Sequence, residues 1–313
     1  MNEDEWGYSL VRKINTYIPN KKSPRNTRFK CLMVLLPFFL SGPLYAEALL
    51  FASWNMNKLT HPSVGGSTRS QSDIRMLSRA SEKIDADIVA LQEVGSARIA
   101  RDVFGSGYEY YMAEKDDRGL RVGFAVRAGV SVSKSYQYTL LAKEGGRMGV
   151  DLTVEGDDGR PVRILNVHLA EGCEESTLPN KSTPSCRVMS NQAKSLDQWV
   201  RYRKEEGIPF MLVGSFSRYL GAEQVDPYPG LLSLFNAQYE QFVDGLTTAS
   251  GDKRPGCWNY SRPDFVDHFL LDPKMAKMVR AESFRESTIS GSGKGGKKTA
   301  FSDHCPIKLW IRT

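Results

Sequence analysis

The sequence predicts an α/β fold built as one large domain. Segments with strand character alternate with segments of helical periodicity from residue 47 to the C-terminus. Several strands stop at a polar residue, an arrangement that gathers functional side chains along one edge of a packed sheet. The chain has 313 residues, of which 41% are hydrophobic and 25% charged, and no linker divides it. We therefore predict one domain over residues 47–313, preceded by an N-terminal extension over residues 1–46.

The first part of the domain has the pattern strand, helix, strand. The apolar segment 48–54 predicts a strand that ends at Asn55. Apolar side chains then recur at helical spacing over residues 70–84. The run 87–92 predicts a second strand, which ends at Glu93. An amide and a carboxylate thus follow consecutive strands.

The remainder of the domain contains further strands and one long helix. The strands are rich in β-branched residues. The helix is predicted over residues 190–205, and a flexible basic loop, rich in glycine, serine and lysine, over residues 291–298. The predicted strands are 121–127, 148–154, 162–169, 210–213, 265–271 and 307–311.

The N-terminal extension has the three parts of a secretory signal peptide. Arg28 and Lys30 precede an apolar run over residues 31–40, and the small residue Ala46 follows. The run is too short to span a hydrocarbon core of about 30 Å. We expect cleavage near Ala46 and a secreted or periplasmic monomer without stable membrane insertion. The alternatives are an uncleaved anchor or a start codon placed too far upstream.

Net charge alone does not predict a nucleic-acid surface. The formal charge is +6, but residues 1–46 carry seven basic and three acidic groups, which leaves +2 on the rest of the chain. Two segments offer aromatic or basic side chains of the kind that contact nucleic acids, Tyr108–Tyr111 and Lys294–Lys298. Both are more typical of ordinary surface, so the substrate class stays open.

The cysteine count agrees with export. Cys31 lies in the predicted signal, which leaves an even set of four cysteines and three ways to pair them. A local bridge Cys173–Cys186 across one polar loop is geometrically easy, and Cys257 would then pair with Cys305. The spacings do not match the paired-cysteine motifs of zinc sites. Disulfides are therefore favoured over a zinc site.

Carboxylate, amide and imidazole side chains stand at or near the ends of the predicted strands. Taken singly, each has an ordinary explanation: Glu93 as a solvated acid, His168 as a hydrogen-bonded structural histidine, Asp303 as a turn cap. Together, their oxygen ligands suit Mg²⁺ or Mn²⁺, which polarise a phosphoryl oxygen, and the imidazoles can act as general base or donor. The set predicts metal-assisted phosphoester hydrolysis. Its members are Asn55, Glu93, Asn166, His168, Asp267, His268, Ser302, Asp303 and His304.

The order of these motifs resembles the endonuclease/exonuclease/phosphatase superfamily, the deoxyribonuclease I-like proteins. Each motif is short, but five occur in the expected order between Leu49 and Ile311. The resemblance implies a four-layer α/β sandwich, with two mixed sheets packed face to face and helices outside. The matching segments are Trp54-Asn55-x-Asn57, Leu91-Gln92-Glu93, Asn166-Val167-His168-Leu169, Val266-Asp267-His268 and Ser302-Asp303-His304-x-Pro306.

The resemblance also implies a metal site. Glu93 is implied to be the principal ligand of Mg²⁺ or Mn²⁺. Asn55 and Asp303 are implied to help to hold the ion. The cofactor expected from the resemblance is therefore one of these two hard cations.

A further group of residues is implied to act on the phosphate. His304 would be the general base or a phosphate contact, oriented by Asp267. His168 would place a second imidazole on the phosphate. Arg147, just before a predicted strand, is a candidate substrate contact.

One motif departs from the family pattern. Where the family has Gly-Asp-x-Asn, this chain has Gly214-Ser215-Phe216-Ser217, so two serines stand at catalytic positions. The family's aspartate is thought to orient or activate the attacking water, and its asparagine to donate to a phosphoryl oxygen. Loss of one such contact commonly costs about 10²–10³ in rate. Three explanations stay open: a natural pseudo-enzyme, a variant inactivated by substitution, or an active site rearranged around Asp226 or Glu223.

The sequence thus predicts an exported, Mg²⁺-dependent phosphodiesterase or nuclease-like hydrolase with impaired activity. Its expected partner is a phosphodiester substrate such as DNA or RNA. The first alternative is a catalytically inactive protein that binds metal or phosphate on the same fold. The second is a sphingomyelinase-type or phosphoinositide-type phosphatase, which usually needs an apolar membrane-engaging loop that this sequence does not show.

Overall fold

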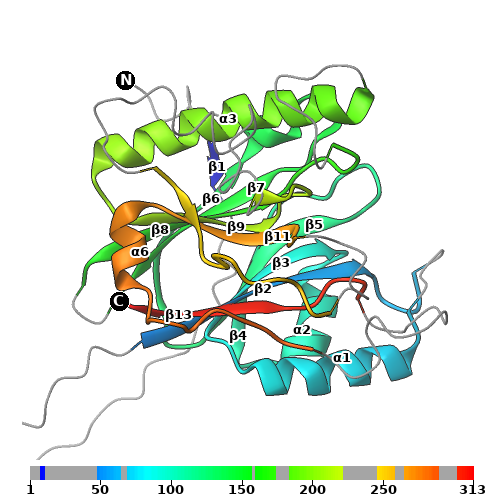
Figure 1. Cartoon of the computed structure of the whole chain (residues 1–313). Coiled ribbons are helices and arrows are strands. Elements are labelled where there is room, and N and C mark those ends of the chain that lie inside the picture. The colour runs from blue at the N-terminus through cyan, green and yellow to red at the C-terminus, as the bar shows by residue number, and fades with distance from the viewer. Residues whose placement is uncertain are drawn as a thin grey trace, which may run out of the picture.

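Two mixed β-sheets packed face to face form the centre of the molecule (Figure 1). The structure is a computed structural model that describes residues 8–10, 48–64, 69–156, 159–173, 183–220, 245–257, 264–288 and 302–313. The apolar run of the predicted signal, its cleavage site near Ala46, the loop 291–298, and both Glu223 and Asp226 lie outside these residues.

The first sheet has seven strands in the order β1-β6-β7-β8-β9-β11-β10, and the second has six in the order β12-β13-β2-β3-β5-β4. The strands of the first sheet are β1 Tyr8–Leu10, β6 Ser131–Tyr138, β7 Gly149–Glu155, β8 Pro161–His168, β9 Phe210–Ser215, β11 Asp267–Leu271 and β10 Thr247–Thr248. Those of the second are β12 Arg285–Glu286, β13 Ile307–Arg312, β2 Ala48–Leu59, β3 Ile88–Val94, β5 Arg121–Arg127 and β4 Tyr108–Met112.

Each sheet contains one parallel pair of strands, and these pairs place the predicted site residues. β2 runs parallel to β3, and β8 runs parallel to β9. Parallel strands bring their carboxyl ends to the same edge of a sheet. The polar residues that end these four strands therefore gather at one edge of the sandwich.

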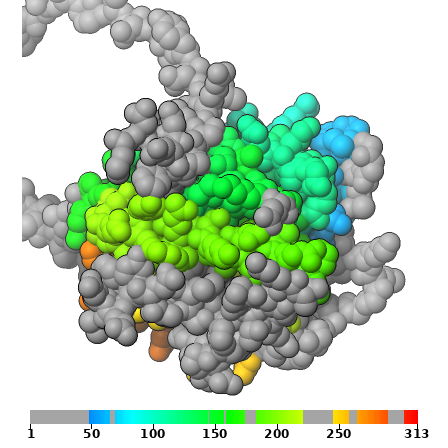
Figure 2. All heavy atoms as spheres, turned by 90° about the horizontal axis from the view of Figure 1, so that it is seen from above, coloured from blue at the N-terminus to red at the C-terminus, as the bar shows by residue number. Residues whose placement is uncertain are grey.

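Helices cover the two outer faces and complete the predicted four-layer sandwich. α1 (Gln71–Ile84) and α2 (Ala97–Phe104) pack on the six-stranded sheet, and α3 (Pro184–Glu206) packs on the seven-stranded sheet (Figure 1). Figure 2 shows α3, in yellow-green, lying across the latter face. The 3₁₀-helix η2 (Thr139–Gly145) and the short α6 (Pro273–Met278) complete the described helices. Among the described residues, no helix is both long and apolar enough to cross a membrane.

Three buried apolar clusters hold these layers together. One lies between the sheets and includes Phe51, Phe124 and Phe269, each no more than 1% exposed. The others lie beneath α3, around Trp199, and beneath α1 and α2, around Trp54. Interiors of this kind are close-packed, so the strand ends that carry the site rest on a rigid base.

The helix ends follow local sequence signals. Ser70 and Asp73 form a capping box at the start of α1, as the prediction over residues 70–84 requires. α3 begins at Pro184, earlier than the predicted residue 190, because Thr183 caps it and proline is favoured in the first turn. Cys186 and Met189, in its first two turns, are buried in the core beneath the helix, so its apolar face begins before residue 190.

Some elements are not predicted by the sequence. α2 and β4 are short, β6 is rich in polar residues, and β1 lies within the N-terminal extension, where it pairs antiparallel with β6. β2 continues past Asn55 to Leu59 through an irregularity in its pairing with β3. Asn57 and Lys58, at φ 44° and 57°, make this bend in the left-handed region. A polar stretch that looked like the end of a strand is therefore a bulge beside the site.

Both predicted disulfides are present. Cys173 is bonded to Cys186, and Cys257 is bonded to Cys305. Cys305 directly follows His304, so the second bridge ties the segment that carries this histidine to the loop before β11.

Candidate functional site

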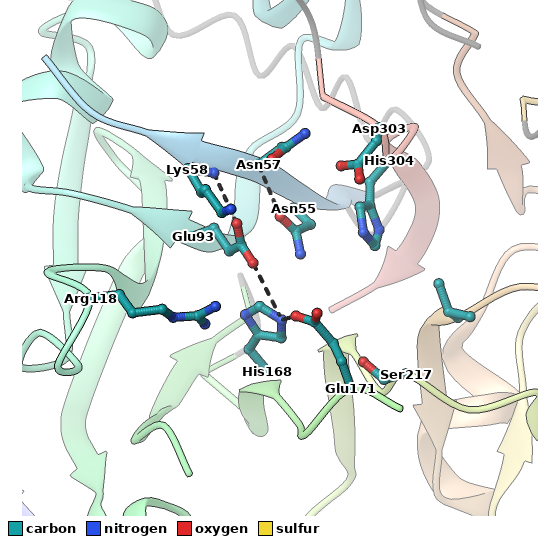
Figure 3. Close-up of a pocket in the computed structure, with 11 residues that line it drawn as sticks. Asn55, Asn57, Lys58, Glu93, Arg118, His168, Glu171, Ser217, Asp303 and His304 are labelled. Atoms are coloured by element: carbon teal, nitrogen blue, oxygen red, sulfur yellow. Dashed lines mark hydrogen bonds and ion pairs between the residues drawn. The ribbon is translucent and has the colours of Figure 1, made fainter. Parts of the chain in front are cut away.

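A pocket of about 230 Å³ opens where β2, β3 and β8 end, and the side chains around it are predominantly polar (Figure 3). It brings together six residues that the sequence singled out for catalysis or metal binding, together with five that it did not. The lining residues are Asn55, Asn57, Lys58, Glu93, Arg118, His168, Glu171, Ser217, Val266, Asp303 and His304.

Glu93 is held in one orientation at the end of β3. Its Oε2 accepts a hydrogen bond from the backbone nitrogen of Lys58 at 2.9 Å, and its Oε1 lies 3.8 Å from His168 Nε2. Glu93 is 7% exposed and has φ 58°, a backbone conformation that non-glycine residues seldom adopt. Such strain is retained where the surrounding structure enforces it, and it is frequent at active sites. The bulge in β2 thus supplies the donor that orients the carboxylate.

Asp267 and His304 form a close pair at the opposite wall of the pocket. His304 Nδ1 lies 2.5 Å from Asp267 Oδ2, and the side chain of His304 lines the pocket. Ser302 fixes the approach of this segment, because its Oγ donates to the Asn55 carbonyl at 2.5 Å and accepts from His304 N at 2.9 Å. A buried carboxylate that bonds one ring nitrogen sets both the tautomer and the direction of the other.

The pKa of Asp267 is lowered in this arrangement. Burial opposes ionisation of the carboxyl group, but the charge and hydrogen bond of His304, and the hydrogen bond from Ser215, outweigh it. Asp267 is therefore a carboxylate at neutral pH. His268, the next residue, turns away from the pocket: its Nε2 contacts the Arg218 carbonyl at 2.9 Å, and burial lowers its pKa.

Ser215 is enclosed between two site residues and does not line the pocket. Its Oγ donates to Asp267 Oδ1 at 2.5 Å and accepts from Asn55 Nδ2 at 3.2 Å. The side chain is 1% exposed. The hydroxyl therefore links the metal-ligand candidate to the histidine–aspartate pair, but it carries no charge and does not reach the space where a water would attack.

Gly214, just before Ser215, is required by the close approach of β8. A Cβ at this position would lie 2.1 Å from the Val167 carbonyl oxygen and 2.8 Å from Asn166 Oδ1, and φ is +128°. Asn166 is itself structural: its Nδ2 donates to the carbonyls of Leu91 and Gly123, in the other sheet. These two hydrogen bonds connect the two sheets behind the pocket.

Ser217 faces the pocket in a strained backbone conformation. Its φ is 52°, in the left-handed region where asparagine is tolerated better than serine. We expect Ser217→Asn to raise the free energy of unfolding by about 0.5–1 kcal/mol. Urea denaturation in EDTA measures this change. Ser217→Ala is the matched control and should not stabilise; equal stabilisation by both substitutions would contradict the backbone explanation.

His168 and Glu171 form the third wall of the pocket. His168 ends β8, and Glu171, three residues later, places its Oε1 3.4 Å from His168 Nε2. The hydrogen bond from His168 lowers the pKa of Glu171, whose side chain is 61% exposed. Glu171 thus presents an ionised carboxylate to the pocket on the side facing Glu93.

Arg147 does not line the pocket. Its Nε donates to Asp116 Oδ2 at 3.1 Å, and one of its terminal nitrogens lies 3.9 Å from Glu171 Oε1. The guanidinium therefore lies behind Glu171 and is committed to two carboxylates. The arginine that the pocket does present is Arg118, from the turn before β5.

The donor set fits a hard divalent cation. Carboxylate oxygens of Glu93, Glu171 and Asp303 line the pocket, and one oxygen each of Glu93 and Glu171 lies within 4.8 Å of the other and of a His168 nitrogen. Ions bound at about 2.0–2.2 Å place their ligands within that range of one another. Asn55 Oδ1 already accepts from Asn57 N at 2.9 Å, so the amide contributes less freely than the carboxylates.

The pocket contains five residues to which the sequence assigned no role: Asn57, Lys58, Arg118, Glu171 and Val266. Asn57 lies within the matching segment Trp54-Asn55-x-Asn57, so the sequence contained information that could have identified it as a site residue. Glu171 follows a strand-end histidine by three residues, which is a weak signal at best. Arg118 and Lys58 lie in a turn and a bulge whose shapes depend on tertiary contacts.

The aromatic segment Tyr108–Tyr111 forms β4 and does not line the pocket. The hydroxyls of Tyr108 and Tyr110 donate to backbone carbonyls at 2.7 Å each. Burial is the main cause that raises the pKa of both groups. The rings of Tyr108 and Tyr110 therefore have a structural role at the edge of the six-stranded sheet.

Comparison with known proteins gives a consistent result. The model of the endonuclease/exonuclease/phosphatase family matches residues 52–304. No curated protein matches the chain in sequence. Solved structures match the fold, and three of them illustrate the range of similarity.

The chain is similar to Caenorhabditis elegans TDP2, at 20% identity and a TM-score of 0.56 over 85% of this chain and 98% of that one. It is similar to the 3′ phosphatase NExo from Neisseria, which was solved with a product DNA hairpin, at 17% identity and 0.55 over 84% and 99%. It is also similar to a mannosyl-6-phosphatase from Bacteroides thetaiotaomicron, at 15% identity and 0.54 over 84% and 99%. At these identities the likeness shows the fold.

Proposed function

The chain belongs to the endonuclease/exonuclease/phosphatase family, and we propose that it is a divalent-metal-dependent phosphodiesterase whose turnover is weakened by Ser215 and Ser217. One observation carries the proposal. The Asp267–His304 pair, at 2.5 Å, faces the same pocket as the carboxylates of Glu93 and Asp303. A site for a cation and an oriented imidazole thus meet in one space, as phosphoester hydrolysis requires.

The chain's own residues can perform most of the reaction. His304, held by Asp267 through Nδ1, accepts a proton from water at Nε2 as the water oxygen attacks phosphorus. The bond from phosphorus to the leaving oxygen breaks, and that oxygen takes a proton from solvent. Arg118 and Ser217 line the pocket, where donors to the phosphoryl oxygens are needed. The imidazole of His304, oriented by Asp267, is therefore retained in this chain although Ser215 and Ser217 replace the family's aspartate and asparagine.

The metal part of the proposal rests on three carboxylates. Glu93, Asp303 and Glu171 would hold Mg²⁺ or Mn²⁺. When bound, such an ion polarises a phosphoryl oxygen and neutralises charge that develops in the transition state. Ser215 cannot supply a carboxylate to the site. Glu171 supplies one, but from a different position, beside His168.

A hydrolysis assay with and without metal tests the proposal. Purified protein should cleave bis-p-nitrophenyl phosphate slowly in Mg²⁺ or Mn²⁺, should stop in EDTA, and should lose the remaining rate when His304 is replaced by alanine. Plasmid DNA and RNA in the same buffers distinguish nuclease from small-phosphoester activity. If none of the three substrates is cut in either metal, the activity claim fails.

A second candidate function is a binding protein on the same fold. The observation that favours it is the position of Ser215, whose hydroxyl is fully used between Asn55 and Asp267. The metal and phosphate contacts survive in that case, but water is not activated. This reading expects a metal-dependent thermal shift without turnover, and absence of any shift would exclude it.

Replacing Glu171 tests the composition of the metal site. We expect Glu171→Gln to weaken Mn²⁺ binding about tenfold, because the amide keeps the shape of the side chain and removes its charge. Isothermal titration calorimetry on the metal-free protein measures the dissociation constant. Glu205→Gln, at an exposed position on α3, is the matched control and should leave affinity unchanged. Equal affinities for all three proteins would remove Glu171 from the site.

Two further parts of the proposal concern substrate and location. A DNA or RNA phosphodiester is the proposed substrate, supported by the product DNA hairpin in the Neisseria structure. Export with cleavage near Ala46 is supported by the signal-peptide pattern and by the two disulfides. Cleavage there would also remove β1, so mass spectrometry of the N-terminus of the exported protein tests this part directly.

A further inference from the structure

A second pocket, of about 630 Å³, lies between α1 and the strand pair β12–β13, apart from the site described above. Its lining has an apolar part from α1, made by Met76, Ala80 and Ile84. Its basic part comes from both sides, and a single carboxylate accompanies it. The charged lining residues are Arg79 and Lys83 of α1, Arg285 and Glu286 of β12, and Lys308 of β13.

The four cations form two like-charge pairs. Arg285 and Lys308 are direct cross-strand partners in the β12–β13 ladder. Arg79 and Lys83 are four residues apart on α1 and so lie on the same helix face. Like charges in either geometry are destabilising, where opposite charges would stabilise. The fold therefore concentrates positive charge here at a cost.

Little in the described part of the chain neutralises this charge. None of the four cations makes an ion pair with a described carboxylate, and Arg285 donates only to the carbonyls of Glu282 and Phe284. Glu286 is engaged elsewhere: its Oε2 accepts from Gly256 N at 2.7 Å and from Cys257 N at 3.0 Å. Burial raises the pKa of Glu286, which weakens it further as a counter-charge.

The pocket also lies close to the proposed active site along one strand. Lys308 is the cross-strand partner of Ala52, three residues before Asn55 in β2. Three strand residues span about 10 Å. Because Ile307 and Leu309 belong to the core between the sheets, Lys308 projects to the α1 face. One strand of a DNA duplex has one phosphate per about 3.4 Å of helix axis, so a distance of about 10 Å corresponds to about three nucleotides.

We infer that this pocket binds the phosphate backbone of a nucleic-acid strand at a distance of a few nucleotides from the scissile group, with the apolar side chains of α1 against a sugar or base. The inference rests on the proposed phosphodiesterase function for its choice of ligand. Four unpaired cations match consecutive phosphates, and the apolar part matches the only surfaces of a nucleic acid that are not charged.

Charge reversal on α1 tests the inference by binding alone. Fluorescence anisotropy in EDTA, where no metal-dependent turnover occurs, measures the affinity for a labelled 20-nucleotide DNA strand and its duplex. We expect Arg79→Glu/Lys83→Glu to weaken binding at least tenfold and to reduce the slope of log K against log salt by about 1–2, as loss of two phosphate contacts requires. Both positions are exposed, so folding should be retained, and thermal denaturation checks it.

Lys134→Glu/Lys194→Glu is the matched control, since it makes the same change in net charge on exposed positions of β6 and α3. Equal losses in both double variants would attribute binding to overall charge, and no loss in the α1 variant would exclude the pocket; either result overturns the inference. Loss of binding to anionic phospholipid vesicles, but not to DNA, would overturn it in favour of a membrane. Hydrolysis of bis-p-nitrophenyl phosphate is read separately, so the active-site proposal can stand when this one fails.

Discussion

Ser215→Asp/Ser217→Asn is expected to raise kcat/KM for bis-p-nitrophenyl phosphate by about 10³, since each restored transition-state contact is worth about 10²–10³ and linked contacts do not add fully. The surroundings of both positions can accept the new side chains. Ser217 already has the left-handed φ of 52° that asparagine tolerates, and it faces the pocket. Ser215 lies beside Asn55 Nδ2, which can donate to the new carboxylate.

The restored aspartate should also make the protein depend on metal for stability. Ser215 Oγ is 2.5 Å from Asp267 Oδ1, so a carboxylate at position 215 stands next to a second carboxylate with no proton between them. Like charges at such a distance disfavour joint ionisation. We therefore expect the double variant to have a lower Tm than the wild type in EDTA and to recover it in Mg²⁺ or Mn²⁺.

Ser215→Asn/Ser217→Asn separates charge from shape. Asparagine at position 215 has the same number of heavy atoms as aspartate but no negative charge. This variant should therefore show less than a tenth of the increase in kcat/KM expected for Ser215→Asp/Ser217→Asn. An equal gain in both double variants would mean that size rather than charge was missing. No gain in either would show that the site is used for something other than hydrolysis, as the binding-protein reading expects.

The layers of the fold were predictable because they depend on patterns that the sequence displays directly. Buried strands such as 121–127 were apparent from β-branched runs, and the helix over residues 70–84 from its apolar spacing. The same patterns failed for β6, because its exposed positions Ser131, Ser133 and Lys134 are polar and leave it without an apolar run. β1 failed for another reason: three residues carry too little signal to identify a strand.

The site was predictable only to the extent that its residues stand at strand ends. Glu93, His168 and His304 were singled out in this way, and the structure brings them to one pocket. Glu171 was not, because its position depends on how the chain turns after β8, where Arg147 and His168 hold it. Ser215 is the opposite case, because the sequence singled it out but could not give its contacts. Only the structure shows that its hydroxyl lies between Asn55 and Asp267.

Asp267→Asn is expected to lower kcat/KM of the Ser215→Asp/Ser217→Asn protein by at least about 10², because the amide can present its NH₂ group to His304 and favour the wrong tautomer. Asp267 makes one hydrogen bond to His304 and one to Ser215, and it is 5% exposed. The substitution keeps the volume of the side chain, so a loss of rate reflects the carboxylate itself. His304→Ala, which removes the imidazole, should give an equal or greater loss.

The pH dependence of stability gives a readout of Asp267 that does not need turnover. Its pKa is lower in the folded protein than the usual value near 3.8, because the effect of burial is outweighed by His304 and Ser215. The stabilisation from this group is therefore present above about pH 4 and is lost as the pH falls through the lowered pKa. Urea denaturation of the metal-free wild type and of Asp267→Asn between pH 7 and pH 3 should show a difference in stability that narrows at the acid end. A constant difference across that range would mean that Asp267 acts through packing, and His304 would then need another partner to hold its ring.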